Sequence, residues 1–326
     1  MSHLSKQIVC FFITLLLTAW TVPAAFGQVG AKYPTRPVTV IIPMSSGTSA
    51  DLGMRLLGRQ TEKYLGQPIV VVNKAGGGGV IGFSAVATAK PDGYNIGLYT
   101  GAAPAFIIPF LEKVPYDTVK DFKFIMQYLN INFGVVVKGD SPFKNFKDLI
   151  AYARQNPKKL TYATNAPNSM ANLIMEQIAK QEGILMTHIP FKSSTEYQAA
   201  LLGNHIQFVA GDFNFPQVEA GETRLLLSFM EKRSEDFPQV PILKDLGYDV
   251  PCPVLNGIFA PKDLPDDIAK KLEDAFSKGM KEPAFIKGIR DLRLSVFHRS
   301  SQELEDYTVQ TYAKFGKMLK EMGLVK

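Results

Sequence analysis

Short runs of apolar and β-branched residues alternate with amphipathic segments along most of the chain. Runs of about four to eight such residues predict buried strands, and apolar residues spaced three or four apart predict helices. We expect strands at residues 38–42, 69–72, 96–100, 133–138, 160–163, 186–190, 207–210, 225–229 and 255–259. We expect helices at residues 83–87, 146–153, 170–181, 195–202, 266–281 and 301–322. This alternation predicts an α/β fold.

The strand at 38–42 leads into a loop of small and hydroxyl-bearing residues and then into a helix. Thr48 and Asp51 stand three residues apart, a spacing typical of a capping box. Free backbone N–H groups at such a helix start can hold an anion without a basic side chain. An ordinary β–α turn is the competing interpretation.

Two further predicted strands also end in small residues. One leads into Asn73 and the four glycines at 76–79, and the other ends at Thr100 and Gly101. The glycine run lacks the Gly-Lys-Ser/Thr of a phosphate loop and the spacing of a dinucleotide fingerprint. It is either a flexible surface loop or a place where backbone approaches a ligand. Because ligands bind at the carboxyl ends of strands in open α/β sheets, these strand ends predict a binding edge.

A second α/β run begins after the strand at 133–138, and the chain returns to the first run at 255–259. One unit inserted into another and joined by two extended segments is the arrangement of a hinged clamshell, which holds its ligand between the lobes. We predict lobe 1 at 28–134 plus 255–326 and lobe 2 at 135–254, with the two extended segments as the crossings.

The first 27 residues predict a secretory signal peptide. Lys6 precedes an apolar run at 8–20, and the small residues Ala25 and Gly27 fit a cleavage site after Gly27. The run falls short of the roughly 20 apolar residues that a membrane anchor needs. We therefore expect a soluble mature chain in the periplasm.

Composition narrows the function classes. The formal net charge of +6 is spread along the chain, which favours acidic ligands and predicts no nucleic-acid partner. Once the signal is removed, Cys252 is the remaining one of two cysteines, so we expect no intrachain disulfide. His188, His205 and His298 are isolated and lack metal-ligand spacing, and no Gly-x-Ser-x-Gly elbow occurs. We predict that the protein is not an enzyme and uses no cofactor or metal.

Seven short motifs follow one another in order from Tyr33 to the C-terminal region. They are Tyr-Pro-Thr-Arg-Pro-Val at 33–38, Pro-Met-Ser-Ser-Gly-Thr-Ser-Ala-Asp at 43–51, Gly-Gln-Pro at 66–68, Asn-Lys-Ala-Gly-Gly-Gly-Gly-Val-Ile-Gly at 73–82, Pro-Asp-Gly-Tyr at 91–94, Ile-Pro-Phe-Lys at 189–192 and Gly-Ile-Phe-Ala-Pro at 257–261. In their order and spacing the chain resembles the Bug/TctC family, the solute-binding receptors of tripartite tricarboxylate transporters. The resemblance implies the two-lobed type II (Venus-flytrap) periplasmic binding-protein fold. It also implies a small organic acid as ligand, either a di- or tricarboxylate or an aromatic carboxylate, and delivery to the membrane permease subunits.

The family holds one carboxylate largely through loop N–H groups, small hydroxyls and ordered waters, which agrees with the neutral loop before Asp51. We expect Asp51 itself to cap its helix rather than contact an anion. The ligand-binding residues we expect are Met44, Ser45, Ser46, Thr48, Ser49, Asn73, Gly77, Gly78, Thr100 and Gly101 in the first lobe, and Asn165, Ala166, Asn168, Ser169, Phe191, Lys192 and Asp212 in the second. For Lys192, a solvated charge at a strand end is an equal alternative.

Several positions depart from the family pattern. Thr48 replaces a glycine, the loop at 162–168 replaces a Gly/Ser-rich one, and Phe191 replaces a tyrosine. Because these positions surround the expected cleft, the identity of the ligand cannot be copied from relatives. The alternatives are a receptor that feeds a sensor kinase and one that binds a neutral amide such as nicotinamide. We expect the protein to act as a monomer.

Overall fold

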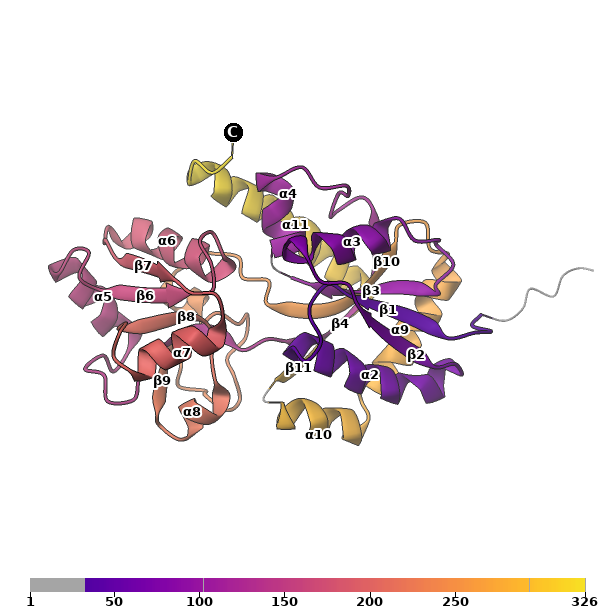
Figure 1. Ribbon diagram of the computed structural model, residues 1–326, viewed down its shortest axis with the longest axis horizontal. Helices are drawn as coiled ribbons and strands as arrows, with labels where there is room; N and C mark the ends of the chain where they lie inside the picture. The colour runs from indigo at the N-terminus through magenta and orange to yellow at the C-terminus, as the bar shows by residue number, and fades with distance from the viewer. Residues whose placement is uncertain (1–32, 102, 293, 326) are drawn as a thin grey trace, which may run out of the picture. The chain divides into compact units, whose positions relative to one another are not determined.

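The computed structural model describes residues 33–101, 103–292 and 294–325, so the predicted signal peptide lies outside the described residues. Two sheets flanked by helices make a two-lobed α/β protein, as predicted (Figure 1). The six-stranded sheet has the spatial order β11 (Ser295–Arg299), β4 (Phe122–Asn130), β10 (Leu255–Pro261), β3 (Asn95–Thr100), β1 (Val38–Ile42) and β2 (Ile69–Asn73). The five-stranded sheet has the order β7 (Thr187–Pro190), β6 (Thr161–Thr164), β8 (Phe208–Asp212), β5 (Phe133–Lys138) and β9 (Thr223–Ser228).

Helices cover both faces of the six-stranded sheet, in which β1 runs parallel to β2 and β3. In Figure 1, α3 (Val80–Ala87) and α11 (Ser301–Glu321) lie above this sheet, and α2 (Ser49–Leu65) and α10 (Pro283–Asp291) lie below it. α9 (Asp266–Gly279) packs against α2, and the short α4 (Ile108–Leu111) lies beside α11. The upper core is aromatic, with the rings of Phe83 and Phe259 4.8 Å apart.

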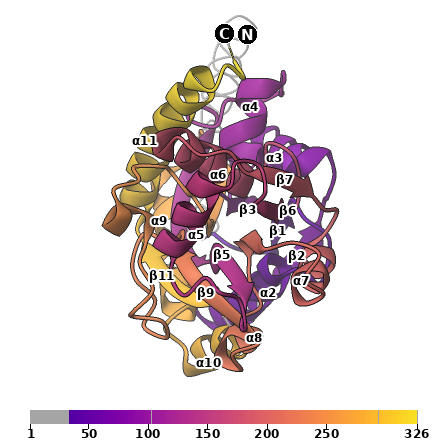
Figure 2. The ribbon, with the colours of Figure 1, turned by 90° about the vertical axis from the view of Figure 1, so that its left-hand side faces the viewer.

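The five-stranded sheet is also covered on both faces, and β6 runs parallel to β7 and β8. Successive residues of β5 point to opposite faces, as strand geometry requires, with Val135 and Val137 in one apolar cluster and Val136 in another. The first cluster contains α5 (Phe146–Gln155) and α6 (Met170–Glu182), and the second contains α7 (Ser194–Leu202) and α8 (Phe215–Glu219). Figure 2 shows α5 and α7 on opposite sides of this sheet.

The chain passes between the sheets at residues 131–132, just before β5, and returns just before β10. The Ile131 N–H donates to the Val254 carbonyl (3.0 Å), so the two connections lie side by side. Cys252, in the returning connection, is buried. The prediction that 133–138 and 255–259 are themselves the crossings is wrong, because each is a strand hydrogen-bonded within one sheet.

Side chains from distant parts of the chain meet beside these connections. Arg299 of β11 forms an ion pair with Glu231, which lies shortly after β9, and also donates to Gln127 of β4. The Arg299 guanidinium lies 4.1 Å from the centre of the Tyr307 ring. These contacts tie β11 and α11 to the segment that leaves β9.

Two predicted features need correction. Residues 69–72 form a strand, but β2 is the edge of its sheet, with Val70 45% and Val72 37% exposed. After residue 259 the sequence predicts helices and no strand; the region is indeed mostly helical, but it also contains β11. β4 and α10 were not predicted at all.

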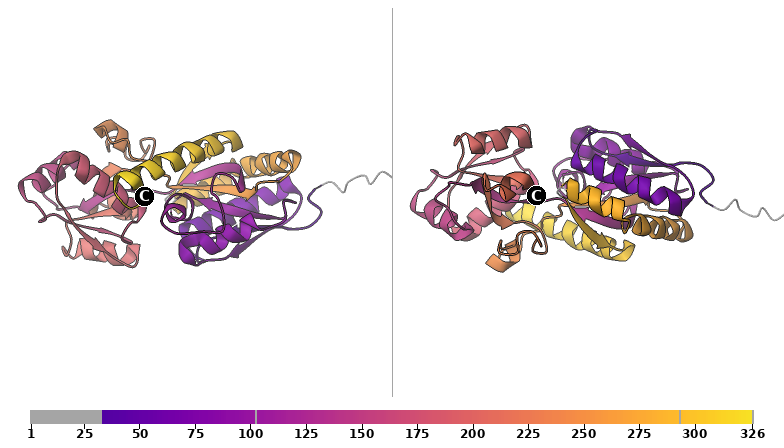
Figure 3. Two further views of the ribbon diagram at one scale, coloured as in Figure 1. Left: turned by 90° about the horizontal axis from the view of Figure 1, so that it is seen from above. Right: turned by 90° about the horizontal axis from the view of Figure 1, so that it is seen from below.

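The C-terminal end of α11 contacts elements of the five-stranded lobe, and Figure 3 shows the course of this helix from above and below. Lys180 of α6 donates through Nζ to the Glu321 carbonyl (3.1 Å), and Lys314 pairs with Asp249 (2.8 Å). Within the described residues, no helix combines the length and the apolar character needed to span a membrane.

Candidate functional site

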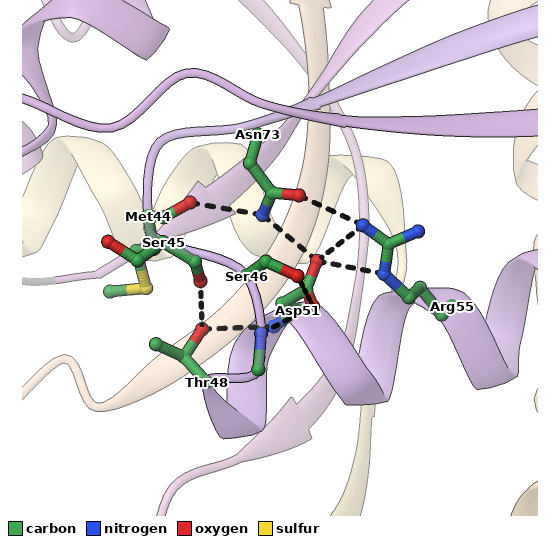
Figure 4. A network of polar contacts seen from close by, with 8 residues as sticks. Met44, Ser45, Ser46, Thr48, Asp51, Arg55 and Asn73 are labelled. Atoms are coloured by element: carbon green, nitrogen blue, oxygen red, sulfur yellow. Dashed lines mark hydrogen bonds and ion pairs between the residues drawn. The ribbon is translucent and has the colours of Figure 1, made fainter.

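The loop after β1 is held by hydrogen bonds among its own residues (Figure 4). Thr48 is the N-cap of α2, because its Oγ1 accepts the Asp51 N–H (3.3 Å). The same hydroxyl donates to the Ser45 carbonyl (3.1 Å). The helix therefore begins at the predicted place with Thr48 as its N-cap, and the Asp51 carboxylate accepts the N–H of Gly47, one residue before the cap.

Asp51 is buried, with 1% of its surface exposed, and its carboxylate holds the loop through hydrogen bonds. Its carboxylate accepts from the Gly47 N–H (2.9 Å), Asn73 Nδ2 (2.9 Å) and Arg55 Nε (3.0 Å). Burial acts to raise the pKa of Asp51, but these hydrogen bonds and the Arg55 charge outweigh burial and hold the pKa below its ordinary value. Because the negative charge of Asp51 and the positive charge of Arg55 balance, this ion pair adds no net charge to the loop.

Asn73, at the end of β2, links two strand ends. Its Nδ2 donates to the Met44 carbonyl (3.0 Å) as well as to Asp51, and its Oδ1 accepts from Arg55 Nη2 (2.9 Å). The amide is thus engaged by the protein itself, which makes Asn73 a residue that positions the loop.

The glycine run after β2 is a turn with left-handed backbone. Residues 76–79 have φ angles of 130°, 55°, 62° and 102°, which side chains rarely tolerate. A Cβ at Gly82, in α3, would lie 2.6 Å from the Pro43 Cα, so α3 can approach the end of β1 this closely only without a side chain. Gly77 and Gly78 are exposed.

The parallel pairing of β1 with β2 and β3 brings the predicted first-lobe residues to one edge of the sheet. Met44, Thr48 and Asn73 are half-buried there, and Ser45, Ser46 and Ser49 are exposed. Thr100 is buried in the sheet, and the Gly101 N–H donates to the Leu255 carbonyl (3.1 Å).

The second lobe repeats this arrangement, because β6, β7 and β8 are parallel and end at a common edge. At the end of β6, Thr164 Oγ1 donates to the Ala166 carbonyl (2.9 Å) and lies 2.8 Å from His188 Nε2. Burial lowers the pKa of His188, against the opposite effect of the Glu176 carboxylate, which favours the neutral imidazole.

α6 begins at this edge with a hydroxyl cap. Ser169 Oγ accepts the Asn172 N–H (3.4 Å) and donates to Thr164 Oγ1 (3.2 Å). The Asn168 N–H donates to Asn172 Oδ1 (2.9 Å) from a left-handed backbone. The side chains of Asn165 and Asn168 are exposed, and both amides offer donors and acceptors.

The remaining predicted residues follow β7 and β8. Phe191 is half-buried, Lys192 is exposed, and the Lys192 N–H donates to Glu196 (3.1 Å). Asp212 is half-buried, and its carbonyl accepts from the Tyr197 hydroxyl (2.9 Å). Phe213, which no sequence motif marked, is half-buried next to Asp212.

A cavity of about 560 Å³ lies at α10, β11 and the segment after β9. Asn130, Phe215, Lys232, Arg290 and Phe297 are among its lining residues, and none of the predicted ligand-binding residues is. No motif marked these positions in the sequence. Across the described ranges, no group of three or more His, Cys, Asp or Glu residues is arranged to hold a metal ion.

The sequence model of the tripartite tricarboxylate transporter family receptor matches residues 54–324. The chain belongs to this family. The receptor is 37% identical over 296 residues to the "UPF0065 protein in gbd 5'region" of Cupriavidus necator, covering 90% of each chain. The Polaromonas TctC solute-binding protein, solved without ligand, has the same fold, with a TM-score of 0.80 at 23% identity over 89% of this chain and 99% of the other. The R. palustris protein Rpa4515, solved with adipate, has a TM-score of 0.73 at 25% identity over 90% of this chain and 99% of the other.

These comparisons confirm the resemblance seen in the motifs and the two-lobed periplasmic binding-protein fold. The family and the fold are those of solute-binding receptors. Which residues of this receptor touch a ligand stays a prediction.

Proposed function

We propose that this receptor captures a small organic acid between its two lobes in the periplasm and delivers it to the permease of a tripartite transporter. The N-terminal signal peptide predicted at 1–27 would direct its export. We further propose that it acts as a monomer, with the lobes divided near residues 134 and 254. The permease is the proposed partner because tripartite transport is the role of the family.

One observation supports the proposal. In each lobe, three parallel strands end at a common edge of the sheet, and a helix begins at that edge. Thr48 and Ser169 cap these helices and their hydroxyls already donate within the protein, so backbone N–H groups and the exposed hydroxyls of Ser45 and Ser49 are the donors on offer. A helix N-terminus favours a negative charge, which suits a carboxylate. The Rpa4515 structure with adipate supports a carboxylate ligand for a relative of this fold.

The test is a titration of signal-free protein that has been unfolded, dialysed and refolded to remove bound ligand. We expect carboxylates to release or take up heat on binding, and a saturating acid at 100 times its Kd to stabilise the protein by about 2.7 kcal/mol. Binding of a neutral amide such as nicotinamide, without any acid, would contradict the proposal.

The role in transport is tested in a deletion strain. We expect loss of uptake of the identified acid, restored by the wild-type gene. Normal uptake with lost induction of acid-responsive genes would instead favour a receptor that feeds a sensor kinase.

A further inference from the structure

We propose that contacts beside the cavity at β11 oppose closure of the two lobes and thereby set the affinity for the ligand. The inference rests on the proposed function, in which the lobes close on an acid at the predicted ligand-binding edges. It makes Glu231 and Lys232 affinity-determining residues, although neither is among the predicted ligand-binding residues.

The two connections divide the edge of the six-stranded sheet that faces the other lobe. They leave from the end of β4 and enter at the start of β10, which are neighbours in the strand order β11–β4–β10–β3–β1–β2. The ends of β3, β1 and β2, where the predicted ligand-binding residues of the first lobe lie, are on one side of the connections. The start of β11 is on the other side, because Ser295 pairs with Asn130 at the end of β4.

The five-stranded sheet is divided in the same way. β5, which receives the first connection, has β8, β6 and β7 on one side and β9 on the other. The predicted ligand-binding residues of the second lobe lie at the ends of β8, β6 and β7. The end of β9 reaches the same edge, because Ser228 pairs with Gly134 near the start of β5, and the segment after β9 lines the cavity together with β11. The cavity therefore lies between the lobes, on the opposite side of the connections from the ligand-binding edges.

The paired connections form the hinge about which the lobes would close. The Ile131 N–H donates to the Val254 carbonyl (3.0 Å), which holds the two connections together. A rotation about them that brings the ligand-binding edges together must separate the lobes on the side of β11. β1 lies two strands beyond β10, which is about 10 Å, and β11 lies one strand beyond β4, which is about 5 Å. The cavity side therefore opens about half as far as the ligand-binding edges approach each other.

Two contacts join the lobes on the cavity side. Glu231, which follows β9, forms an ion pair with Arg299 of β11. The Lys232 ammonium lies 5.2 Å from the centre of the Phe297 ring of β11, within the range of a cation–π interaction. Because closure on the ligand separates β11 from the segment after β9, closure must lengthen or break both contacts.

A contact that opposes closure raises the dissociation constant of the ligand. When a ligand binds only the closed receptor, the apparent Kd is the Kd of the closed form divided by the fraction of receptor that is closed. Removing a contact on the cavity side raises that fraction, so it should tighten binding although no residue at the ligand-binding edges changes. The Glu231 side chain is 34% exposed, so an amide of the same shape can replace it without disturbing a packed core.

The first test compares Glu231→Gln with the wild type in calorimetric titrations of refolded protein with adipate, benzoate and citrate. Glu231→Gln removes the charge that pairs with Arg299, and we expect it to bind the acid that the wild type prefers about two- to fivefold more tightly. Glu182→Gln is the matched control, because Glu182 pairs with Arg154 (2.8 Å) within the five-stranded lobe. This control should leave the affinity unchanged.

The second test follows closure of the lobes in the absence of any ligand. Lys74→Cys and Thr195→Cys place spin labels at exposed positions beside the two ligand-binding edges, and the buried Cys252 stays unlabelled. We expect Glu231→Gln to increase the population with the shorter distance between the labels, measured by double electron–electron resonance. Glu182→Gln should leave the distance distribution unchanged.

The outcomes separate this inference from the proposed function. Equal or weaker acid binding by Glu231→Gln overturns the inference and leaves the proposed function standing. If no acid binds the wild type, the proposed function fails, and the label distances alone decide whether these contacts oppose closure. Should Glu231→Gln fail to fold, Lys232→Gln provides the second variant, and it should also bind the acid more tightly; an unchanged affinity in that variant overturns the inference.

Discussion

Asp51 organises the first loop because one buried carboxylate satisfies donors from three separate segments. Gly47, Arg55 and Asn73 all donate to it, and Asn73 lies 22 residues away in the sequence. The Thr48–Asp51 spacing predicted the helix start, since capping depends on neighbouring residues. The contact with Asn73 could not be predicted in this way, because it depends on the pairing of β1 with β2.

Replacing Asp51 should therefore cost more than replacing an ordinary capping residue. We expect Asp51→Ala to lower the free energy of unfolding by about 2–4 kcal/mol, because it leaves Arg55 and buried donors without an acceptor. Urea unfolding measures this change. Asp148→Ala is the matched control, since Asp148 holds the same position in the capping box of α5, and it should cost about 1 kcal/mol.

The Asp51 contribution should also depend on pH. Because its pKa is lowered in the folded state, its stabilisation is complete above the unfolded value of about 3.9 and fades as the pH falls through the lower folded value. The difference in unfolding free energy between wild type and Asp51→Ala should shrink in that acidic range. A difference that stays constant down to the lowest pH would contradict this account.

His188 gives a second pH dependence with the same sign. Its pKa is lowered in the folded state, so the unfolded chain takes up the proton first as the pH drops below about 6.5. We expect urea unfolding to show a loss of stability between pH 7.5 and pH 5 that His188→Gln reduces. His298→Gln, at an exposed position, should retain the full loss.

At the scale of elements, strands and helices could be predicted wherever the apolar residues followed the repeat of a strand or the repeat of a helix alone. The continuous valines of β2 indicated a buried strand, but hydrophobicity alone cannot distinguish a central strand from an edge that leaves Val70 and Val72 exposed. β4 was not predicted because Lys123 and Gln127 interrupt its apolar run. In the structure Lys123 is hydrogen-bonded to Asp266 and Gln127 to Arg299, both far along the chain. These partners come close only in the folded protein, so the local sequence pattern does not indicate them.

The approach of α3 to the strand ends is testable at Gly82. We expect Gly82→Ala to lower the free energy of unfolding by about 1–3 kcal/mol, because the new Cβ would meet the Pro43 backbone at 2.6 Å. Gly47→Ala separates this steric effect from backbone strain, since Gly47 has a φ of 84° and open space around its missing Cβ. That control should cost about 1 kcal/mol. Equal costs for the two variants would count against a packing role for Gly82.

At the scale of the molecule, two lobes were predictable because an interrupted α/β pattern implies an inserted unit. The exact crossings were not, because β5 and β10 look like any other apolar strand until their pairing is known. The contacts of Arg299 could not be predicted from the sequence either, because Glu231 is separated from it by 68 residues.

Arg299 should matter to the whole molecule because it joins β11, β4 and the segment after β9. It is 12% exposed, so we expect Arg299→Ala to lower the free energy of unfolding by about 2–3 kcal/mol, because it leaves the buried Gln127 without its donor and removes the ion pair with the partly exposed Glu231. Arg290→Ala, at an exposed site of α10, should change it by less than about 0.5 kcal/mol. Guanidinium-induced unfolding distinguishes the two, and a similar small change in both would contradict the role of Arg299.

The single buried thiol in the returning connection gives this receptor an internal chemical probe. Burial raises the pKa of Cys252 well above its ordinary value, so the reactive thiolate is suppressed while the chain is folded. A thiol reagent can therefore modify Cys252 only when the paired connections separate from their neighbours. The rate of modification, followed with and without an acid, would report how often this region opens and whether the ligand restrains it, with no label introduced.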